Sequence, residues 1–477
     1  MKGYKMKLPP EVSRILGKLA EHGYEAYVVG GCVRDALLGR EPEDWDITTS
    51  AKPVQVKKIF SRTVDTGLQH GTVTVLVHGR GYEVTTYRVD GEYEDGRHPK
   101  EVAFTTSLRM DLERRDFTIN AMAYNEKDGL VDEFDGIGDL ERGIIRCVGD
   151  AGQRFDEDAL RMLRAVRFSG QLGFRIEKGT RLAIAGRVSS LSKISAERIR
   201  VEIVKLLVSD GAAQLMMAYE LGMTGIFMPE FDDMMECDQH NHHHIYTVGE
   251  HSIHGVEQIN RFFAHDTAVQ VSDYARRKLY SICDMLDKKQ HMILVTAMLL
   301  HDVAKPEMMV IDEEGVGHFT GHPERGAEAA GKIMRRLTFD NVSVDTAVRL
   351  IRYHDYRMEP TARAVRRAAS RIGKDIVWME FLMQYCDVLS QNPETFAEKL
   401  ERLDEAMQIY EEVEAAGQPL CVRELAVNGR DLIAAGIEPG PELGRILQQL
   451  LEIVLQEPGK NTREELLEYV KKELNRI

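Results

Sequence analysis

The sequence has little of what marks a secreted or membrane protein. Its 477 residues include six cysteines, none of them in a CxxC pair, so neither a disulfide framework nor a cysteine zinc site is indicated. The longest mainly apolar run, Met292 to Leu300, is nine residues long, less than half of what a membrane-spanning helix needs. The N-terminus lacks the apolar stretch of a secretory signal. We therefore expect a cytoplasmic protein with no membrane partner.

Glycine and proline are not enriched, and aromatic residues make up only 7% of the chain. With 43% hydrophobic and 29% charged residues, the composition is that of a folded protein and argues against extensive disorder. A chain of 477 residues is too long for one hydrophobic core, so we expect between two and four domains.

The net charge of −15 is unusual for a protein that binds nucleic acid, but the charge is unevenly distributed. Residues 1–210 contain 33 basic and 33 acidic side chains, so the excess of acid lies in the rest of the chain. Residues 154–205 contain 12 basic and 6 acidic side chains. This locally basic stretch is compatible with phosphate binding in spite of the overall sign.

Short β-like runs alternate with helical ones in the first part of the chain. The patterns predict strands at 24–29, 44–49, 71–77 and 82–89, the last two paired across HGRG. The polar string from Asp90 to Thr106 has no periodicity and is predicted to be a mobile loop. From about Asp156 onward helical periodicity takes over. We predict the α+β class: a small mixed-sheet head followed by helical domains.

Four predicted domains follow from these patterns. Twelve of the 16 histidines lie between His240 and His354, which sets that stretch apart as a module. The predicted divisions are a head at residues 1–147, a helical neck at 148–235, a histidine-rich module at 236–396 and a helical tail at 397–477.

Two carboxylates stand two residues apart in EDWDITT. On a strand, Asp44 and Asp46 project from the same face while Trp45 points to the other. Such a pair can hold two divalent cations, the arrangement that nucleotidyl transfer needs to activate a 3′-hydroxyl and stabilise the leaving pyrophosphate. Mg²⁺ suits the site because it takes few carboxylates and fills its shell with phosphate oxygens and water. Alone, the motif is a weak signal, and a solvated strand end is the better interpretation of it.

The neighbouring sequence favours the metal site. Gly30 and Gly31 follow an apolar strand and open a helix that carries Arg34, so backbone N–H groups there can approach a triphosphate closely. Glu83, on a nearby predicted strand, is a candidate third catalytic acid.

Five segments occur in an order that resembles a known family. GGCVRDALLG, EDWDITT, RRDFTINAMAYN, EDALR and SAERIRVEI are similar to the ordered motifs of the class II tRNA nucleotidyltransferase and bacterial poly(A) polymerase family, over roughly residues 20–230. The resemblance implies that Arg115 binds phosphate, that Asp116 supports the link between head and neck, and that Asn120 contacts the ribose.

The EDALRMLRAVRF segment predicts how the base is chosen. Asp158 and Arg161 are three residues apart on a predicted helix, so they would be neighbours able to orient one another. A carboxylate accepts from the exocyclic amino group of C or A, while a guanidinium donates to a ring nitrogen or carbonyl. The resemblance implies that this pair acts as a protein template and that Arg164 and Arg167 help to bind the nucleotide.

The histidine-rich module contains a second constellation in the segments GEHSIHG, LLHDVAKP, TGHPERGAE, IRYHDYR and YCDVLSQ. Histidines followed by a His-Asp doublet and a late Asp resemble the HD phosphohydrolase superfamily. The resemblance implies a divalent metal (Mn, Fe, Ni or Mg) that activates water for phosphoester hydrolysis. Lys305 is a nearby candidate for phosphate binding. The implied ligands are His251, His301, Asp302, His322, His354 and Asp387.

Three hypotheses remain open from the sequence. The first is a transferase that adds C, C and A to tRNA from CTP and ATP, with an accessory HD phosphoesterase and a tRNA-binding tail. The second is the same chemistry with a poly(A), A-only or CC-only product. The third makes the HD phosphohydrolase the main activity and the head an RNA-binding platform. The oligomeric state is undetermined, with a monomer as the default.

Overall fold

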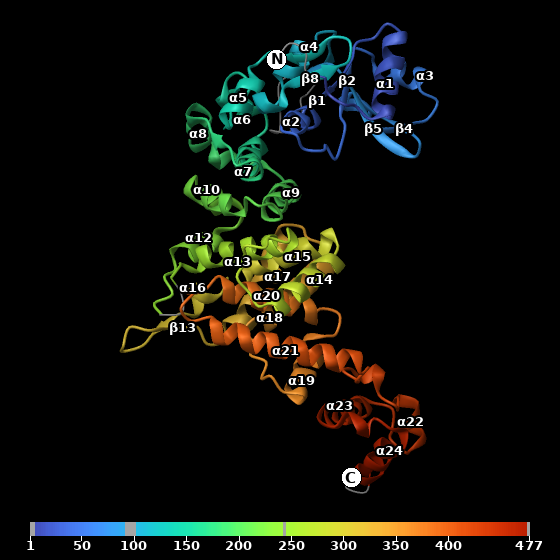
Figure 1. The fold of residues 1–477 in the computed structure, drawn as a ribbon, viewed down its shortest axis with the longest axis vertical. Helices are drawn as coiled ribbons and strands as arrows, with labels where there is room; N and C mark the ends of the chain where they lie inside the picture. Colours follow the sequence, from blue (N-terminus) through green and yellow to red (C-terminus); the bar gives the residue numbers. More distant parts are fainter. Residues whose placement is uncertain (1–4, 91–101, 242–244, 475–477) are drawn as a thin grey trace. The chain divides into compact units, whose positions relative to one another are not determined.

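The computed structural model describes residues 5–90, 102–241 and 245–474 (Figure 1). The chain divides into two compact units, Met1–Phe227 and Met228–Ile477. Within the described ranges, every helix is too short or too polar to cross a membrane.

The first unit is built on a seven-stranded mixed sheet. Strand β2 (Ile47–Thr49) lies at its centre, parallel to β5 (Arg80–Thr86) and antiparallel to β1 (Ala26–Val29). The other four strands extend the sheet on both sides in antiparallel pairs, in the full order β3-β4-β5-β2-β1-β8-β9. Their bounds are Thr63–Gly67 for β3, Thr72–Val77 for β4, Met122–Asn125 for β8 and Gly129–Asp132 for β9.

The predicted strands are found with shifted ends. The strand expected at 82–89 is interrupted at Tyr87, where β5 ends and β6 (Arg88–Asp90) begins. Strand β6 pairs with β7 (Val102–Phe104), so both described ends of the predicted mobile loop are strands. Residues 91–101, the middle of that loop, lie outside the described residues.

Short helices cover the sheet and lead away from it. Helix α2 (Gly31–Leu37) follows β1 directly, and α4 (Leu108–Glu113) lies near β6. Tyr27, Tyr87 and Leu112 belong to one buried core cluster that joins the sheet to α4. The neck of the unit is helical: α6 (Ala151–Glu157), α7 (Leu160–Leu172), α8 (Lys178–Ala185) and α9 (Ala196–Leu207), followed by short turns.

The second unit is almost entirely helical. At its centre is α15 (Lys288–Leu300), whose residues from Ile293 to Leu300 are all buried, which explains why this stretch is the longest apolar run in the sequence. Helices α13 (Val248–Phe263), α18 (Asn341–Tyr353) and α20 (Val377–Leu389) pack against it, and α17 (His322–Arg336) packs against α18 (Figure 1).

The last helices have a core of their own. Helix α21 (Ala397–Ala415) contacts α20, whereas α22 (Gly429–Ala434), α23 (Pro441–Gln456) and α24 (Arg463–Leu474) enclose a separate cluster that includes Leu432, Leu450 and Val470. The α+β class is confirmed: the sheet is confined to the head and the rest is mostly helix.

Candidate functional site

The predicted acid pair lies at the start of the central strand of the head. Asp44 and Asp46 directly precede β2, and the backbone already pairs there, since Val29 N donates to Asp46 O at 3.0 Å. Trp45 is buried between the two exposed aspartates. This alternation places both carboxylates on one side of the chain, as the pattern predicted. Strand β2 itself begins only at Ile47, the residue after Asp46.

Glu83 reaches the same end of the sheet through strand register. The parallel pairing of Ile47 with Val84 puts Glu83 alongside Asp46 on the neighbouring strand. Desolvation by the surrounding protein and the negative charges of Asp46 and Asp44 raise the pKa of Glu83. Desolvation and Asp44 likewise raise the pKa of Asp46, while Arg115 opposes them. Three mutually repelling carboxylates in one place are a suitable donor set for hard cations such as Mg²⁺.

The glycine turn brings the backbone next to Arg115. Gly30 has a φ of 82° and precedes α2, and a Cβ built on it would lie 3.1 Å from Nη1 of Arg115. Arg34, in the last turn of α2, donates to Oδ1 of Asn120 at 2.7 Å. Among the described residues, Nε of Arg115 is buried with no hydrogen-bond partner. The structure thus gathers Gly30, Arg34, Arg115 and Asn120.

Asp116 connects this group to the neck. Its carboxylate accepts from Arg164 Nη2 on α7 at 2.6 Å and from Asn120 Nδ2 at 3.1 Å. Burial opposes its ionisation, but Arg164 and the hydrogen bond from Asn120 lower its pKa to about 2. Next along α7, Arg167 pairs with the buried Glu202 at 2.5 Å and lies over the ring of Phe168. Both predicted nucleotide-binding arginines therefore have protein partners.

The predicted contact between Asp158 and Arg161 is wrong in its geometry. The helix is interrupted at Asp158, which caps α6, and α7 begins at Leu160. Asp158 accepts from Arg198 of α9 at 2.7 Å, whereas Arg161 pairs with Glu157 at 2.7 Å. The two residues are still joined through the backbone, where Arg161 N donates to Asp158 O at 3.0 Å, but Asp158 lies at the break between the helices and the two side chains contact other partners. Arg198, inside the SAERIR motif, was not predicted as a site residue.

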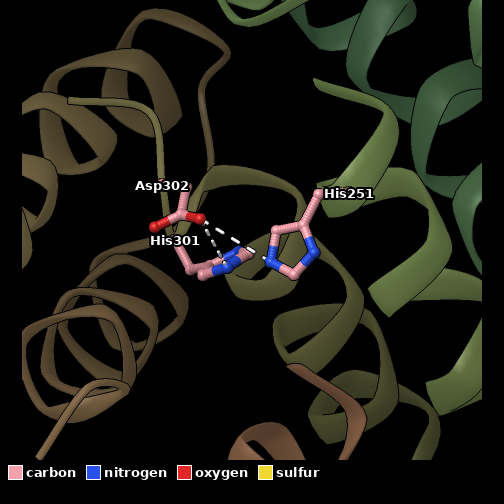
Figure 2. Close-up of side chains that lie close together, drawn as sticks. All are labelled: His251, His301 and Asp302. Carbon is pink, nitrogen blue, oxygen red and sulfur yellow. Dashed lines mark ion pairs between the residues drawn. The ribbon is translucent and has the colours of Figure 1, made fainter. Parts of the chain in front are cut away.

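The six residues predicted for the second centre come together in the second unit. His251 is on α13, His301 ends α15 and Asp302 follows it. His301 Nε2 lies 3.1 Å and His251 Nε2 3.7 Å from Asp302 Oδ2, as Figure 2 shows. Asp387 of α20 closes this group, with Oδ1 2.8 Å from His251 Nε2 and 3.3 Å from His301 Nε2.

A second group shares Asp302. Its other oxygen, Oδ1, lies 3.3 Å from His322 Nε2 and 3.5 Å from His354 Nε2. His251, His301 and Asp302 form one set with metal-ligand spacing, and Asp302, His322 and His354 form another. All five side chains are buried.

The backbone fixes the histidine rings. Nδ1 of His301, His322 and His354 each lies within 2.8 Å of a carbonyl oxygen three residues earlier in the chain. A carbonyl only accepts, so Nδ1 carries a proton, and Nε2 is the ring atom that faces Asp302 and that a metal would bind in place of a proton.

The donor set fits a divalent metal. His301 Nε2 and both carboxylate oxygens of Asp302 are buried and, among the described residues, make no hydrogen bond of acceptable geometry. Burial opposes protonation of His301, yet Asp302 and Asp387 raise its pKa to about 10, so the site favours positive charge. Lys305 Nζ already lies 2.7 Å from Asp302 Oδ2, which places the predicted phosphate-binding lysine against a candidate ligand instead.

Family models match three parts of the chain. Residues 26–146 match a model described as "Poly A polymerase head domain", residues 173–235 one described as "Probable RNA and SrmB- binding site of polymerase A", and residues 322–470 one described as "tRNA nucleotidyltransferase domain 2 putative". The first spans the sheet and its acid pair, and the third spans His322, His354 and Asp387.

Curated relatives carry one name. The CCA-adding enzyme of Limosilactobacillus fermentum is 56% identical over 193 residues, 40% of this chain and 48% of the relative, so this match spans about half of the relative's length. The CCA-adding enzyme of Limosilactobacillus reuteri is 34% identical over 466 residues, 96% of this chain and 94% of the relative. A crystal structure of the Bacillus stearothermophilus CCA-adding enzyme in complex with CTP superposes with a TM-score of 0.67 at 29% identity, covering 98% of each chain.

The head is a mixed sheet with acidic residues at the start of its central strand, and it is joined to a helical neck. These features define a polymerase-type head domain. The near full-length match then shows the family: the chain belongs to the CCA-adding enzyme family.

Proposed function

We propose that this protein adds C, C and A to the 3′ end of tRNA from CTP and ATP, releasing pyrophosphate. The observation that carries the proposal is the set of Asp44, Asp46 and Glu83 at one end of the sheet, beside the Gly30 turn and Arg115. Asp44 and Asp46 would hold Mg²⁺, which supplies Lewis acidity for the attacking hydroxyl and the leaving pyrophosphate. The relatives named CCA-adding enzymes and the CTP complex of one of them support this activity.

The residues around the acids each have a part in the proposed reaction. The Gly30 turn and Arg115 bind the triphosphate, Asn120 contacts the ribose, and Asp158 and Arg161 read the base. Asp116 positions Arg164 and so joins the head to the neck.

The decisive experiment extends a tRNA that ends before CCA, with labelled CTP and ATP, and resolves products at single nucleotides. Three additions support the proposal. Two additions, one addition or a long tail would instead assign a CC-adding, an A-adding or a poly(A) activity. Asp44→Asn serves as the inactive control.

We also propose a metal-dependent phosphoesterase at the second centre, an HD-type site. This second function is favoured by a set of converging side chains in which, among the described residues, His301 Nε2 and both Asp302 oxygens are buried without a hydrogen bond: His251, His301, Asp302, His322, His354 and Asp387. A divalent metal there would supply activated water for the hydrolysis of a phosphoester.

This activity is tested by hydrolysis of bis(p-nitrophenyl) phosphate and 2′,3′-cyclic AMP with Mn²⁺, Ni²⁺ or Mg²⁺, after chelator treatment of the protein. Hydrolysis that returns with metal and is lost in Asp302→Asn supports the proposal. A protein that binds no metal and hydrolyses neither compound contradicts it.

A further inference from the structure

A cavity of about 160 Å³ opens beside the second centre. Two residues of the centre, His354 and Asp387, line it directly. The rest of the lining comes from the segment after α18, from α20 and from the first turns of α21. The cavity is smaller than the range of about 300–1,000 Å³ typical of sites that enclose a whole small molecule. It therefore suits one end of a larger ligand that also reaches the centre.

Cationic side chains line this cavity together with the carboxylates of Asp355 and Asp387. Among the described residues, neither Lys399 nor Arg357 takes part in an ion pair, whereas Arg402 on the same wall is paired with Glu359 at 2.9 Å. Lys399 is half-buried, and burial lowers its pKa while Asp387 and Asp355 oppose that effect. Two unpaired cations in a concave site favour a ligand with negative charge.

Lys399 is held next to the candidate metal ligand. Its Nζ donates to Oε1 of Gln391 at 2.6 Å, and Nε2 of the same Gln391 donates to Oδ2 of Asp387 at 3.0 Å. One side chain thus separates the ammonium group from the centre. A tetrahedral anion presents several oxygens, so one group can contact both the centre and the ammonium.

Besides the polar side chains of Asp355 and Gln384, the remaining wall is apolar and aromatic. Met358, Val388 and Leu403 line it together with Tyr356. Such a surface can pack against a sugar or a base, as aromatic and aliphatic side chains do in nucleotide sites. The cavity therefore combines features that suit the two halves of a nucleoside phosphate.

We propose that Lys399 and Arg357 bind the non-bridging oxygens of a nucleoside phosphate ester presented to the second centre, with the sugar against the wall of Tyr356. This inference rests on the proposed phosphoesterase function and names residues that select its substrate. The same chemistry is offered by a free nucleotide and by a phosphorylated RNA end.

The direct test is binding of inorganic phosphate to the full chain loaded with Mn²⁺, measured by calorimetry. We expect Lys399→Met and Arg357→Ala each to weaken phosphate binding by about 10-fold or more, because a charge-assisted hydrogen bond is lost. Lys399→Arg should retain most of the affinity. Lys374→Met, which removes a surface lysine paired with Glu424 away from the cavity, should bind phosphate like the wild type.

Two further readouts separate this inference from the proposed function. Manganese content should be equal in all variants, because neither Lys399 nor Arg357 is a candidate ligand. Competition of phosphate by 2′,3′-cyclic AMP and by a short RNA with a 3′-phosphate identifies which source binds more tightly. If the wild type loads no metal and hydrolyses no ester, the proposed function fails. If the loaded wild type binds no phosphate, or Lys399→Met binds it equally well, the inference fails.

Discussion

Asp116 supports the first site through more contacts than its position in the sequence indicates. Its carboxylate is buried, accepts from two side chains and lies between the head sheet and helix α7. Removing one partner of a buried ion pair leaves the other charge uncompensated, which costs more than the pair itself contributes. The residue therefore couples the stability of the first unit to the position of Arg164.

We expect Asp116→Asn to destabilise the first unit by about 2 kcal/mol at pH 7. The folded pKa of Asp116, about 2, lies below its ordinary value of 3.8, so its contribution to stability is complete above about pH 4 and is lost as the pH falls toward 2. Urea unfolding at pH 7 and pH 3 measures both effects. The difference between variant and wild type should shrink at pH 3, and Asp65→Asn, in an exposed pair with Lys57, should change little. An equal difference at both pH values would contradict the prediction.

Arg161→Ala should relax selection of C and A over U and G more than it slows addition. A bidentate base contact is worth about 1–3 kcal/mol, so we expect selectivity to fall by about 10-fold or more. Incorporation of each of the four nucleotides into a tRNA lacking CCA measures this. Arg181→Ala, which removes an exposed arginine of α8 paired with Glu220, is the matched control. Unchanged selectivity would remove the template role.

Residue types were easier to predict than their partners. Asp44 and Asp46 could be named because their spacing is a local signal, and the six residues of the second centre because their types and order resemble those of the HD phosphohydrolase superfamily. The partnership of Asp158 with Arg198 could not, because it depends on a helix break between α6 and α7 and on a residue 40 positions away. Lys399 carries no motif, and only the packing of α21 against α20 brings it to the cavity.

Among the elements, the turn between β1 and α2 fixes Arg115. Gly30 has the positive φ that side chains rarely adopt, and its missing Cβ leaves room for the guanidinium of Arg115. Gly23, before β1, has the same φ of 82°, but a Cβ added there would meet nothing within 4 Å. Substitutions at the two glycines therefore distinguish the effect of backbone strain from the effect of the contact with Arg115.

We expect Gly30→Ala and Gly23→Ala each to lose at least about 1–2 kcal/mol of stability, because both place a Cβ at a φ of 82°, which residues other than glycine rarely adopt. Only Gly30→Ala should also reduce nucleotide addition, since its methyl group displaces Arg115. Thermal unfolding and the tRNA extension assay measure the two effects. Equal activity of both variants would show that the contact has no role in catalysis.

Element types followed from periodicity, but element boundaries did not. The alternating runs around residues 26–29 and 72–86 are strands because both their faces and their turns are encoded locally. The tail was predicted to begin at residue 397, where α21 does start. The predicted division between residues 396 and 397 nevertheless passes through the cavity beside the second centre. The first turn of α21 supplies Lys399 to this cavity, whose other walls come from earlier parts of the chain.

At the scale of the whole molecule, the two candidate centres belong to different compact units. Asp44 and Asp302 are each central to one of them. Their separation predicts that the two activities can be removed one at a time.

We expect Asp44→Ala to lower nucleotide addition by more than about 100-fold and to leave phosphoester hydrolysis unchanged, because loss of a proposed metal ligand should cost more than the roughly 10–100-fold that loss of a residue behind a ligand costs. Asp302→Ala should do the reverse. Both assays on both variants, with metal content measured in parallel, test this. Joint loss of both activities in either variant would contradict the existence of two independent centres.

Asp302 makes both halves of the second centre depend on a single residue. Because its two oxygens face two different histidine pairs, one codon specifies a member of both groups. Drift at His322 or His354 can erode one half and leave the other intact, whereas drift at Asp302 ends both together. A lineage that retains the transferase alone would thus be expected to discard the second centre in a single step.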